Sequence, residues 1–537
     1  MNQVEVKRRQ IEVCSNMIGL INILAFGRIL GNNGITYFFI ALEGFCAFWI
    51  LSTGALSDTL GKMLRMRIAK GQYKNAMCIR KKVLILAGSV SAVLSILFAA
   101  CAGAFSETFF KVPHSGLIMA ILAPALFMRT ISAVLIGFFQ GEGSELPAVV
   151  AAPLRQVMLM IFGLLFAKLL SDYGAKVSNL LENPTYTAMY AGMGIAIAID
   201  LAELMVLVFM SLLTLGNKQS LRKRNSEGMR QTDSWRSIVR ILWGSMWMTV
   251  LIQAFELLPL LIGTIFYRKS VDELGIFAEN FGLFAGKFFA FCGIWVLLIC
   301  AILICMDAKT VNAFRKDDIR GAKMIFQSGL HIGVTHGLLC SAYVAIMSEQ
   351  LGGLISEANG RVLAELFRSG SIGIFFAGLF FYFSRLLLMM GRKYHLLGCL
   401  GIVNILFIIV ASVLLNSGEA GILSVIYAGI LAMAIGTLIL GFLCCGMLHT
   451  GIGWIQVIAI PTGAICVTGL ACMFLGRLLT PHLGNGATVL VCLVVSVIID
   501  WSILLFFRSF TEQELKYIPG GGVIRAAGQL LGVFNRG

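Results

Sequence analysis

Ten ionisable side chains inside the long apolar stretches of this 537-residue sequence are candidates for a functional role. An ionised group in the hydrocarbon core of a bilayer costs roughly 2.5–3.5 kcal/mol on insertion scales, so such residues commonly bind an ion or a substrate, or pair with one another. The ten residues are Arg28, Glu43, Arg129, Arg155, Lys168, Asp200, Glu203, Glu256, Lys287 and Arg385.

Glu43, Glu256 and Lys287 are predicted to lie at one depth. At about 1.5 Å per residue, each is roughly 12–14 Å from the outer end of its apolar stretch. Carboxylates at this level could bind H⁺ or Na⁺, with Glu256 as the exchanging group. Lys287, or Arg28 just above it, could hold an anionic headgroup. The alternative is a static Glu256–Lys287 ion pair that joins two helices.

Two nearby features suit such a site. Pro259 follows Glu256 by about one turn and can kink a helix, which frees a backbone carbonyl. Gly282 and Gly286 form a G-x-x-x-G pattern before Lys287, and this pattern permits close contact between helices.

A second polar cluster is predicted from Arg129, Arg155, Asp200 and Glu203. Asp200 matches the depth of Arg129, and Glu203 follows Asp200 by one turn on nearly the same face. An intralobe salt-bridge cluster is the first interpretation and a part in a proton path is the alternative. Arg385 and Lys168 lie near helix ends, where long basic side chains are expected to extend toward water.

Other chemistry is not indicated. His331 and His336 are five residues apart, a poor spacing for one helix face, so no metal site is expected. The sequence has no phosphate-binding loop of the G-x-x-x-x-G-K-[ST] type and no evident nucleophile–base set. We therefore expect neither an enzyme nor catalytic residues, and no cofactor other than a possible Na⁺ or H⁺ coupling ion.

Membrane-spanning helices must position these residues. The chain is 58% hydrophobic and 13% charged, and apolar runs of about 20 residues match a hydrocarbon core of about 30 Å. Such runs are too long and continuous for barrel strands, which predicts an all-α polytopic membrane protein. We expect about fourteen helices at 12–30, 35–57, 83–106, 116–139, 149–170, 187–215, 241–265, 279–303, 323–347, 369–390, 396–415, 422–446, 454–475 and 487–507.

Basic residues predict the orientation. With the N-terminus inside, 29 Lys and Arg residues fall in cytoplasmic segments and 7 in outer ones. This asymmetry places both termini in the cytoplasm. The net charge of +15 is therefore explained by topology, and the expected partner is a lipid bilayer rather than nucleic acid. The sequence does not indicate an oligomeric state.

A basic segment divides the chain. We expect a cytoplasmic linker at 216–240, because Leu221–Arg224 lies at the centre of the most polar interior stretch. The expected parts are an N-terminal lobe (1–215, helices one to six), a C-terminal lobe (241–446, helices seven to twelve), two additional helices (447–507) and a cytoplasmic tail (508–537). A faint internal echo around Asp58 and Asp307 supports two pseudo-repeats.

Motifs in the first 160 residues carry a resemblance to a known family. They are GRILGNNG (27–34), LSTGALS (51–57), KGQYKNA (70–76), LAPALF (122–127) and GFFQG (137–141), with Pro147 after the last. In this order and spacing they resemble the stage V sporulation protein B and polysaccharide-exporter branch of the multidrug/oligosaccharidyl-lipid/polysaccharide flippase superfamily. The resemblance implies two lobes around a V-shaped central cavity, lined by helices one, two, seven and eight.

The resemblance also implies an activity. We expect an ion-coupled, alternating-access flippase or exporter in the bacterial plasma membrane. Its cargo would be an amphiphilic, lipid-linked oligosaccharide or polysaccharide precursor moved from the inner to the outer leaflet. One alternative is a multidrug or organic-cation antiporter on the same fold. Another is a non-transporting membrane partner of a glycan-synthesis enzyme, since Ile136 stands where relatives carry Arg.

Overall fold

The fold was analysed in a computed structural model that describes residues 3–217, 232–418, 421–451, 453–518 and 520–530. Over these ranges the chain is almost entirely helical and contains no strand. The expected linker at 216–240 lies mostly outside the described residues, because 218–231 are not among them.

Twelve helical runs within the described ranges are long and apolar enough to cross a membrane. Two of these runs, Val4–Ala69 and Ile455–Phe506, each contain a glycine that leaves the helical conformation. Gly31 has φ 65° and ψ −178°, and Gly484 has φ 73° and ψ 171°. These angles are essentially restricted to glycine. Each glycine separates two expected helices, so the all-α fold with about fourteen long helices is confirmed.

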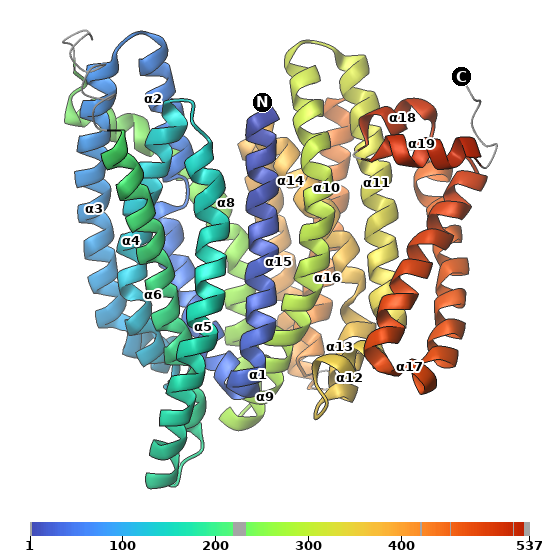
Figure 1. The fold of residues 1–537 in the computed structure, drawn as a ribbon, viewed down its shortest axis with the longest axis horizontal. Helices are drawn as coiled ribbons and strands as arrows, with labels where there is room; N and C mark the ends of the chain where they lie inside the picture. Colours follow the sequence, from blue (N-terminus) through green and yellow to red (C-terminus); the bar gives the residue numbers. More distant parts are fainter. Residues whose placement is uncertain (1–2, 218–231, 419–420, 452, 519, 531–537) are drawn as a thin grey trace. The chain divides into compact units, whose positions relative to one another are not determined.

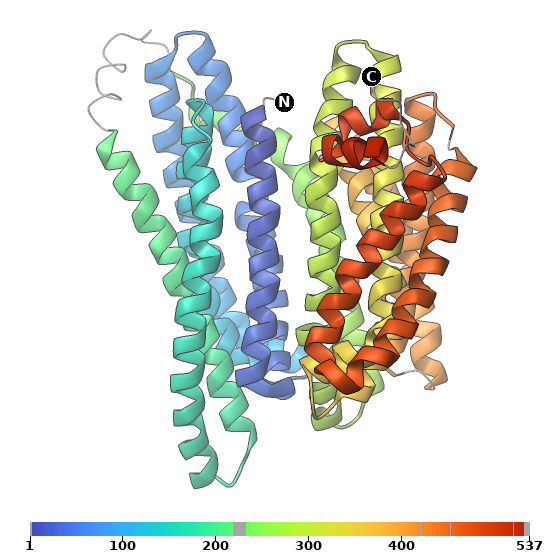
Figure 2. The same cartoon turned by 45° about the vertical axis from the view of Figure 1, so that its right-hand side comes forward.

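Residues 18–286 form one compact unit. Its helix α4 contacts α2, α3 and α6, while α5 and α6 pack along each other as a long pair (Figures 1 and 2). The elements are the later part of α1 (Gln3–Thr53), α2 (Leu56–Ala69), α3 (Tyr73–Ala104), the π-helical η1 (Phe105–Phe109), α4 (Ser115–Gly141), α5 (Leu146–Leu180), α6 (Thr185–Gly216), α8 (Trp235–Ser270) and α9 (Leu274–Leu283).

The G-x-x-x-G pattern makes the expected close contact in this unit. A Cβ added at Gly282 would collide with the backbone of Asn32, and one added at Gly286 would meet the side chain of Ile35. Nearby, Thr36 Oγ1 donates a hydrogen bond of 2.6 Å to the Ala278 carbonyl. The absence of side chains at the two glycines thus brings α9 against α1.

Residues 1–17 and 287–537 form the second unit. Within it α11 contacts α10, α14 and α17, and the two parts of α17 run side by side (Figure 2). Its elements are the start of α1, the second half of the π-helical η2 (Phe284–Phe289), α10 (Ala290–Arg315), α11 (Ile319–Ile346), α12 (Ser348–Ile355), α13 (Gly360–Gly370), α14 (Ile372–Met389), α15 (Lys393–Ser417), α16 (Leu423–Met447), the π-helical η3 (Ile455–Ala459), α17 (Ile460–Phe506), α18 (Glu512–Tyr517) and α19 (Gly521–Leu530).

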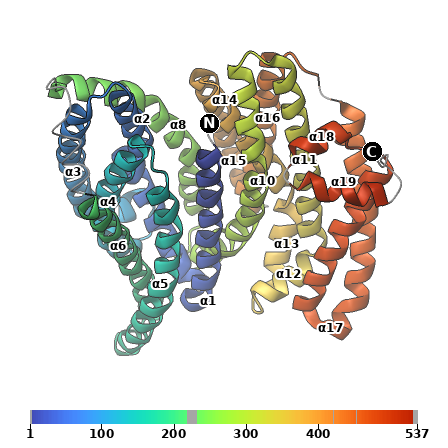
Figure 3. The same ribbon diagram turned by 45° about the horizontal axis from the view of Figure 1, so that its top comes forward.

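Short helices fill segments that were expected to be loops. In α13 the apolar Leu363 and Phe367 are buried, while Arg361 and Arg368 on the other side are exposed. A helix of eleven residues with one apolar face is too short to register as a span. The tail likewise folds into α18 and α19, which pack against each other (Figure 3).

The residue boundaries of the compact units differ from those of the expected lobes. Helix α8 belongs to the unit 18–286, where it contacts α2 and α3. The expected C-terminal lobe began at residue 241, within this helix. The lobe boundaries therefore stay predictions. The same holds for the assignment of 447–507 as additional helices and of 508–537 as a tail.

Candidate functional site

Glu43 is the most enclosed of the four candidates for ion or substrate binding. It lies on the later part of α1 and is 2% exposed. Thr264 of α8 donates a hydrogen bond of 2.8 Å from Oγ1 to Glu43 Oε1. The second oxygen, Oε2, is buried and has no hydrogen-bond partner among the described residues. One carboxylate oxygen is therefore held in place while the other is free to bind a proton or a cation.

The polar cluster predicted in the N-terminal lobe assembles around Glu203, which is 1% exposed. Arg155 Nε lies 2.7 Å from Glu203 Oε1, and Arg129 Nε lies 3.6 Å from the same oxygen. The Arg129 guanidinium also lies over the Trp49 ring, 4.2 Å from its centroid. These contacts agree with the salt-bridge interpretation. Asp200, half-buried, makes no ion pair with a described residue.

The later part of α1 connects Glu43 to this cluster. Cys46 follows Glu43 by about one turn, and Trp49 follows Cys46 by about one turn, so each lies on the same side of the helix as the one before it. Cys46 lies within electrostatic range of both Glu43 and Arg129. This part of α1 therefore carries Glu43 together with two residues that lie next to Arg129.

Glu256 and Arg28 have open surroundings in the unit that contains them. Both side chains are exposed there, and neither has a hydrogen bond or an ion pair with another described residue. Pro259 lies inside α8, one turn after Glu256. One turn before it, Gln253 Nε2 donates to the Gly54 carbonyl at 3.0 Å. That bond ties α8 to the end of α1 next to an unpaired carboxylate.

Lys287 belongs to the other unit and lies in the π-helical segment Phe284–Phe289. Its Nζ donates a hydrogen bond of 2.9 Å to Ser356 Oγ, in the connection between α12 and α13. Short π-helical segments are often found at functional sites. The proposed ion pair of Glu256 with Lys287 stays a prediction, since the two residues are in different units.

The expectation for Arg385 is wrong. Its Nη1 lies 3.4 Å from Oδ2 of Asp307, which is 1% exposed, so the guanidinium is paired inside the second unit rather than extended to water. In the sequence, Asp307 is marked only by the faint internal repeat. The two residues are far apart in the sequence, and only the packing of α14 on α10 reveals the pair.

A second buried carboxylate was missed. Asp500, on the later part of α17, is 0% exposed, and neither of its oxygens has a hydrogen-bond partner among the described residues. The signal was present in the sequence, because Asp500 is the one acidic residue in the predicted helix 487–507. Among the residues described, no cluster of three or more His, Cys, Asp or Glu side chains could hold a metal ion.

Comparisons with known proteins bear on the fold. No family model matches this chain. Stage V sporulation protein B of Bacillus subtilis (strain 168) is 24% identical over 144 residues, which are 27% of this chain and 28% of that protein. The matched segment thus spans little more than a quarter of the curated relative.

Solved structures match over nearly the whole chain. The lipid II flippase MurJ in an inward closed conformation has a TM-score of 0.65 at 12% identity, covering 94% of this chain and 98% of its own. An inward-facing multidrug resistance MATE family transporter of the MOP superfamily has a TM-score of 0.60 at 12% identity, covering 83% of this chain and 99% of its own.

These matches confirm the expected resemblance and the fold class. The chain has the two-lobe, all-α fold of MurJ and of MATE transporters. The proteins found to share this fold are transporters and flippases, not enzymes. It is a multi-pass membrane fold built from many spanning helices.

Proposed function

We propose that this chain is an ion-coupled, alternating-access flippase or exporter of the bacterial plasma membrane, with both termini in the cytoplasm. Its cargo is an amphiphilic, lipid-linked oligosaccharide or polysaccharide precursor that moves from the inner to the outer leaflet. The lobes predicted at 1–215 and 241–446 would rock against each other during this movement. The observation that carries the proposal is the fold shared with MurJ over 94% of the chain.

Two further observations support a lipid-linked cargo. The curated match is a sporulation protein, and MurJ, whose fold this chain shares, is a lipid II flippase. Lys287 or Arg28 would supply positive charge for the diphosphate of such a cargo. Arg28 has no acidic partner among the described residues, so its guanidinium is available to an anion.

The state of Glu43 supports ion coupling. A carboxylate with one oxygen bonded to Thr264 and the other unpartnered is expensive to keep ionised in a low-dielectric site. Binding of H⁺ or Na⁺ would remove that cost. An ion that binds one conformation better than the other shifts the balance between them, which would couple its gradient to cargo movement.

A multidrug or organic-cation antiporter is the second candidate. The likeness to MATE transporters supports it, and so does the exposed, unpaired Glu256 in α8. A soluble cation would be attracted by an acidic wall, whereas an anionic headgroup would not. The two candidates therefore differ in the charge of the cargo.

The test uses purified protein in liposomes. We would follow access of an external quencher to a fluorescent polyprenyl-diphosphate sugar, with and without an imposed Na⁺ or H⁺ gradient. The variants are Glu43→Gln and Glu256→Gln, and the matched control is Asp172→Asn, an exposed acid near the end of α5. Uptake of a fluorescent organic cation is measured in the same vesicles.

We expect gradient-dependent flipping by wild type and by Asp172→Asn, and its loss in Glu43→Gln and in Glu256→Gln. Cation uptake without sugar-lipid flipping would instead establish the antiporter. Flipping at the same rate with and without either gradient would refute the proposed ion coupling. If folded protein shows neither flipping nor cation uptake, transport is refuted and a role as a partner of a glycan-synthesis enzyme is favoured.

A further inference from the structure

The later part of α17 packs antiparallel to α11 within the second unit. Three contacts fix the register: His331 Nε2 lies 2.9 Å from Ser509 Oγ, the rings of His336 and Trp501 lie 5.7 Å apart, and Tyr343 Oη donates to the Val489 carbonyl at 2.6 Å. Asp500, next to Trp501, is therefore level with the stretch of α11 that begins at Thr335.

Asp500 has no charged counterpart in this region. Segments 324–346 of α11 and 455–476 of η3 and α17 contain no Lys, Arg, Asp or Glu. The carboxyl group of Asp500 is fully buried, and both oxygens lack a partner among the described residues. Thr335 Oγ1, at the same level of α11, is also buried without a partner. The polar groups of Asp500 and Thr335 thus both lie in an apolar layer without hydrogen-bond partners among the described residues.

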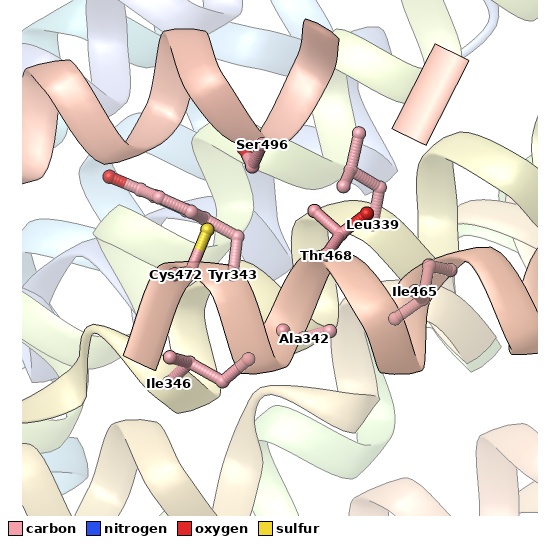
Figure 4. Close-up of a pocket in the computed structure, with 9 residues that line it drawn as sticks. Leu339, Ala342, Tyr343, Ile346, Ile465, Thr468, Cys472 and Ser496 are labelled. Atoms are coloured by element: carbon pink, nitrogen blue, oxygen red, sulfur yellow. The ribbon is translucent and has the colours of Figure 1, made fainter. Parts of the chain in front are cut away.

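Neighbouring hydroxyls are already used. One turn before Asp500, Ser496 lines a small, partly open pocket between α11 and both parts of α17. Figure 4 shows Ser496 pointing toward Thr468 and Cys472 of the earlier part. Ser496 donates to the Leu493 carbonyl, and Thr468 donates to the Ala464 carbonyl. These hydroxyl hydrogens are therefore not available to Asp500.

Four titratable groups of α11 face this region. Cys340 and His336 lie closest to the level of Asp500, while His331 lies at Ser509 and Tyr343 at Val489. Cys340 lies within electrostatic range of Asp500, and His336 lies one turn before Cys340. His336 Nδ1 is 3.0 Å from the Ile332 carbonyl. Because a carbonyl can only accept, Nδ1 carries the hydrogen, and Nε2 is the basic nitrogen of the neutral ring. The earlier part of α17 carries a titratable thiol at Cys472.

This set of groups selects between the possible ligands. An ionised carboxylate with no partner costs several kcal/mol in an apolar interior, so a proton or a cation must neutralise it. Hard metal cations take about six or more oxygen ligands. Asp500 is joined here by a single free hydroxyl, a thiol and an imidazole, which suit a proton better than Na⁺.

We propose that Asp500 is a proton-binding site in the second unit. When the proton leaves, the O–H bond of the carboxyl breaks and the proton passes to a water molecule, which leaves a carboxylate at Asp500. This site lies outside the unit that holds Glu43, and proton binding to it does not depend on the identity of the cargo.

Dicyclohexylcarbodiimide tests the proposal, because this apolar reagent modifies protonated carboxyl groups inside membrane proteins. Full-length protein in lipid nanodiscs is treated at acidic, neutral and alkaline pH, with and without Na⁺, and the modified peptides are quantified by mass spectrometry. Asp500→Asn is nearly isosteric and removes the site. Wild-type Asp307, which is paired with Arg385, serves as an internal control.

We expect modification of Asp500 at acidic pH, loss of modification at alkaline pH, no protection by Na⁺ and little modification of Asp307. Protection by Na⁺ would overturn proton binding in favour of a sodium site. Modification that does not change with pH would show a permanently neutral, structural carboxyl. No modification at any pH would also overturn the proposal. Wild-type labelling decides the matter even if Asp500→Asn does not fold. Expected labelling without any flipping would leave this site standing and reject the proposed function.

Discussion

Replacement of Arg155 by Met tests whether the Glu203 cluster stabilises its unit. Arg155 Nε lies 2.7 Å from Glu203 Oε1, and Glu203 is 1% exposed. Removal of one partner of a buried pair costs about 3–5 kcal/mol, because it leaves a buried charge uncompensated. Here Arg129 stays 3.6 Å from the same oxygen. We therefore expect the free energy of unfolding to fall by about 2–3 kcal/mol, at or below the lower end of that range.

A pair with the same distance but a different environment provides the control. Arg368 Nη2 also lies 2.7 Å from Glu349 Oε1, but their side chains are 62% and 74% exposed. Exposed ion pairs contribute about 1 kcal/mol or less. Arg368→Met should therefore cost under about 1 kcal/mol. The comparison isolates burial, because charge type, distance and substitution are the same.

The assay is equilibrium unfolding of each variant in mixed micelles, with the double variant Arg155→Met/Glu203→Gln completing a cycle. We expect the double variant to cost about 1–2 kcal/mol less than the two single changes together, since contacting residues couple by this much. Equal costs for Arg155→Met and Arg368→Met would refute the argument from burial. Strict additivity in the cycle would show that Arg155 and Glu203 do not interact.

Two further predictions concern packing and pH. Gly282→Ala should separate α9 from Asn32 and lower the free energy of unfolding by about 1–3 kcal/mol. The thermal midpoint of the unit 18–286 should therefore fall, and an unchanged midpoint would contradict the close contact. Burial raises the pKa of Glu514, but the nearby His331 ring and hydrogen bonds from Thr511 outweigh it and hold that pKa below its usual range. A lowered pKa in the folded state stabilises docking of α18 above the ordinary value of about 4.5, and this stabilisation is lost as pH falls through the lowered value. Hydrogen exchange in α18 should therefore increase on acidification, and Glu514→Gln should show the increase already at neutral pH.

Most of the fold could be predicted from the sequence, because each spanning helix needs about 20 apolar residues and shows them locally. Gly31 and Gly484 illustrate the limit of this signal. The sequence showed a break near each of them, but the reversal depends on backbone angles that only the folded chain displays. Helix α13 was missed for the opposite reason, since its apolar face is too short to resemble a span.

The candidate residues were found more readily than their partners. Glu43 was identified from its depth alone, yet its hydrogen bond with Thr264 joins residues 221 positions apart. The same holds for Asp307 and Arg385, whose pairing depends on how α10 meets α14. Hydropathy reports how deep a residue lies, whereas the direction of its side chain follows from helix packing, which one sequence does not reveal.

The division of α1 between the two units has a consequence for synthesis. Residues 3–17 pack with a unit whose remaining residues begin at 287, and Gln10 Nε2 contacts Cys305 Sγ, 295 positions later. At about 5–20 residues per second, the first helix waits roughly 15–60 s for these neighbours to be made. Until then its polar Gln10 has no partner from that unit. Residues translated after position 287 thus complete the environment of residues 3–17. A fragment that starts after residue 17 would lack this helical segment of the second unit.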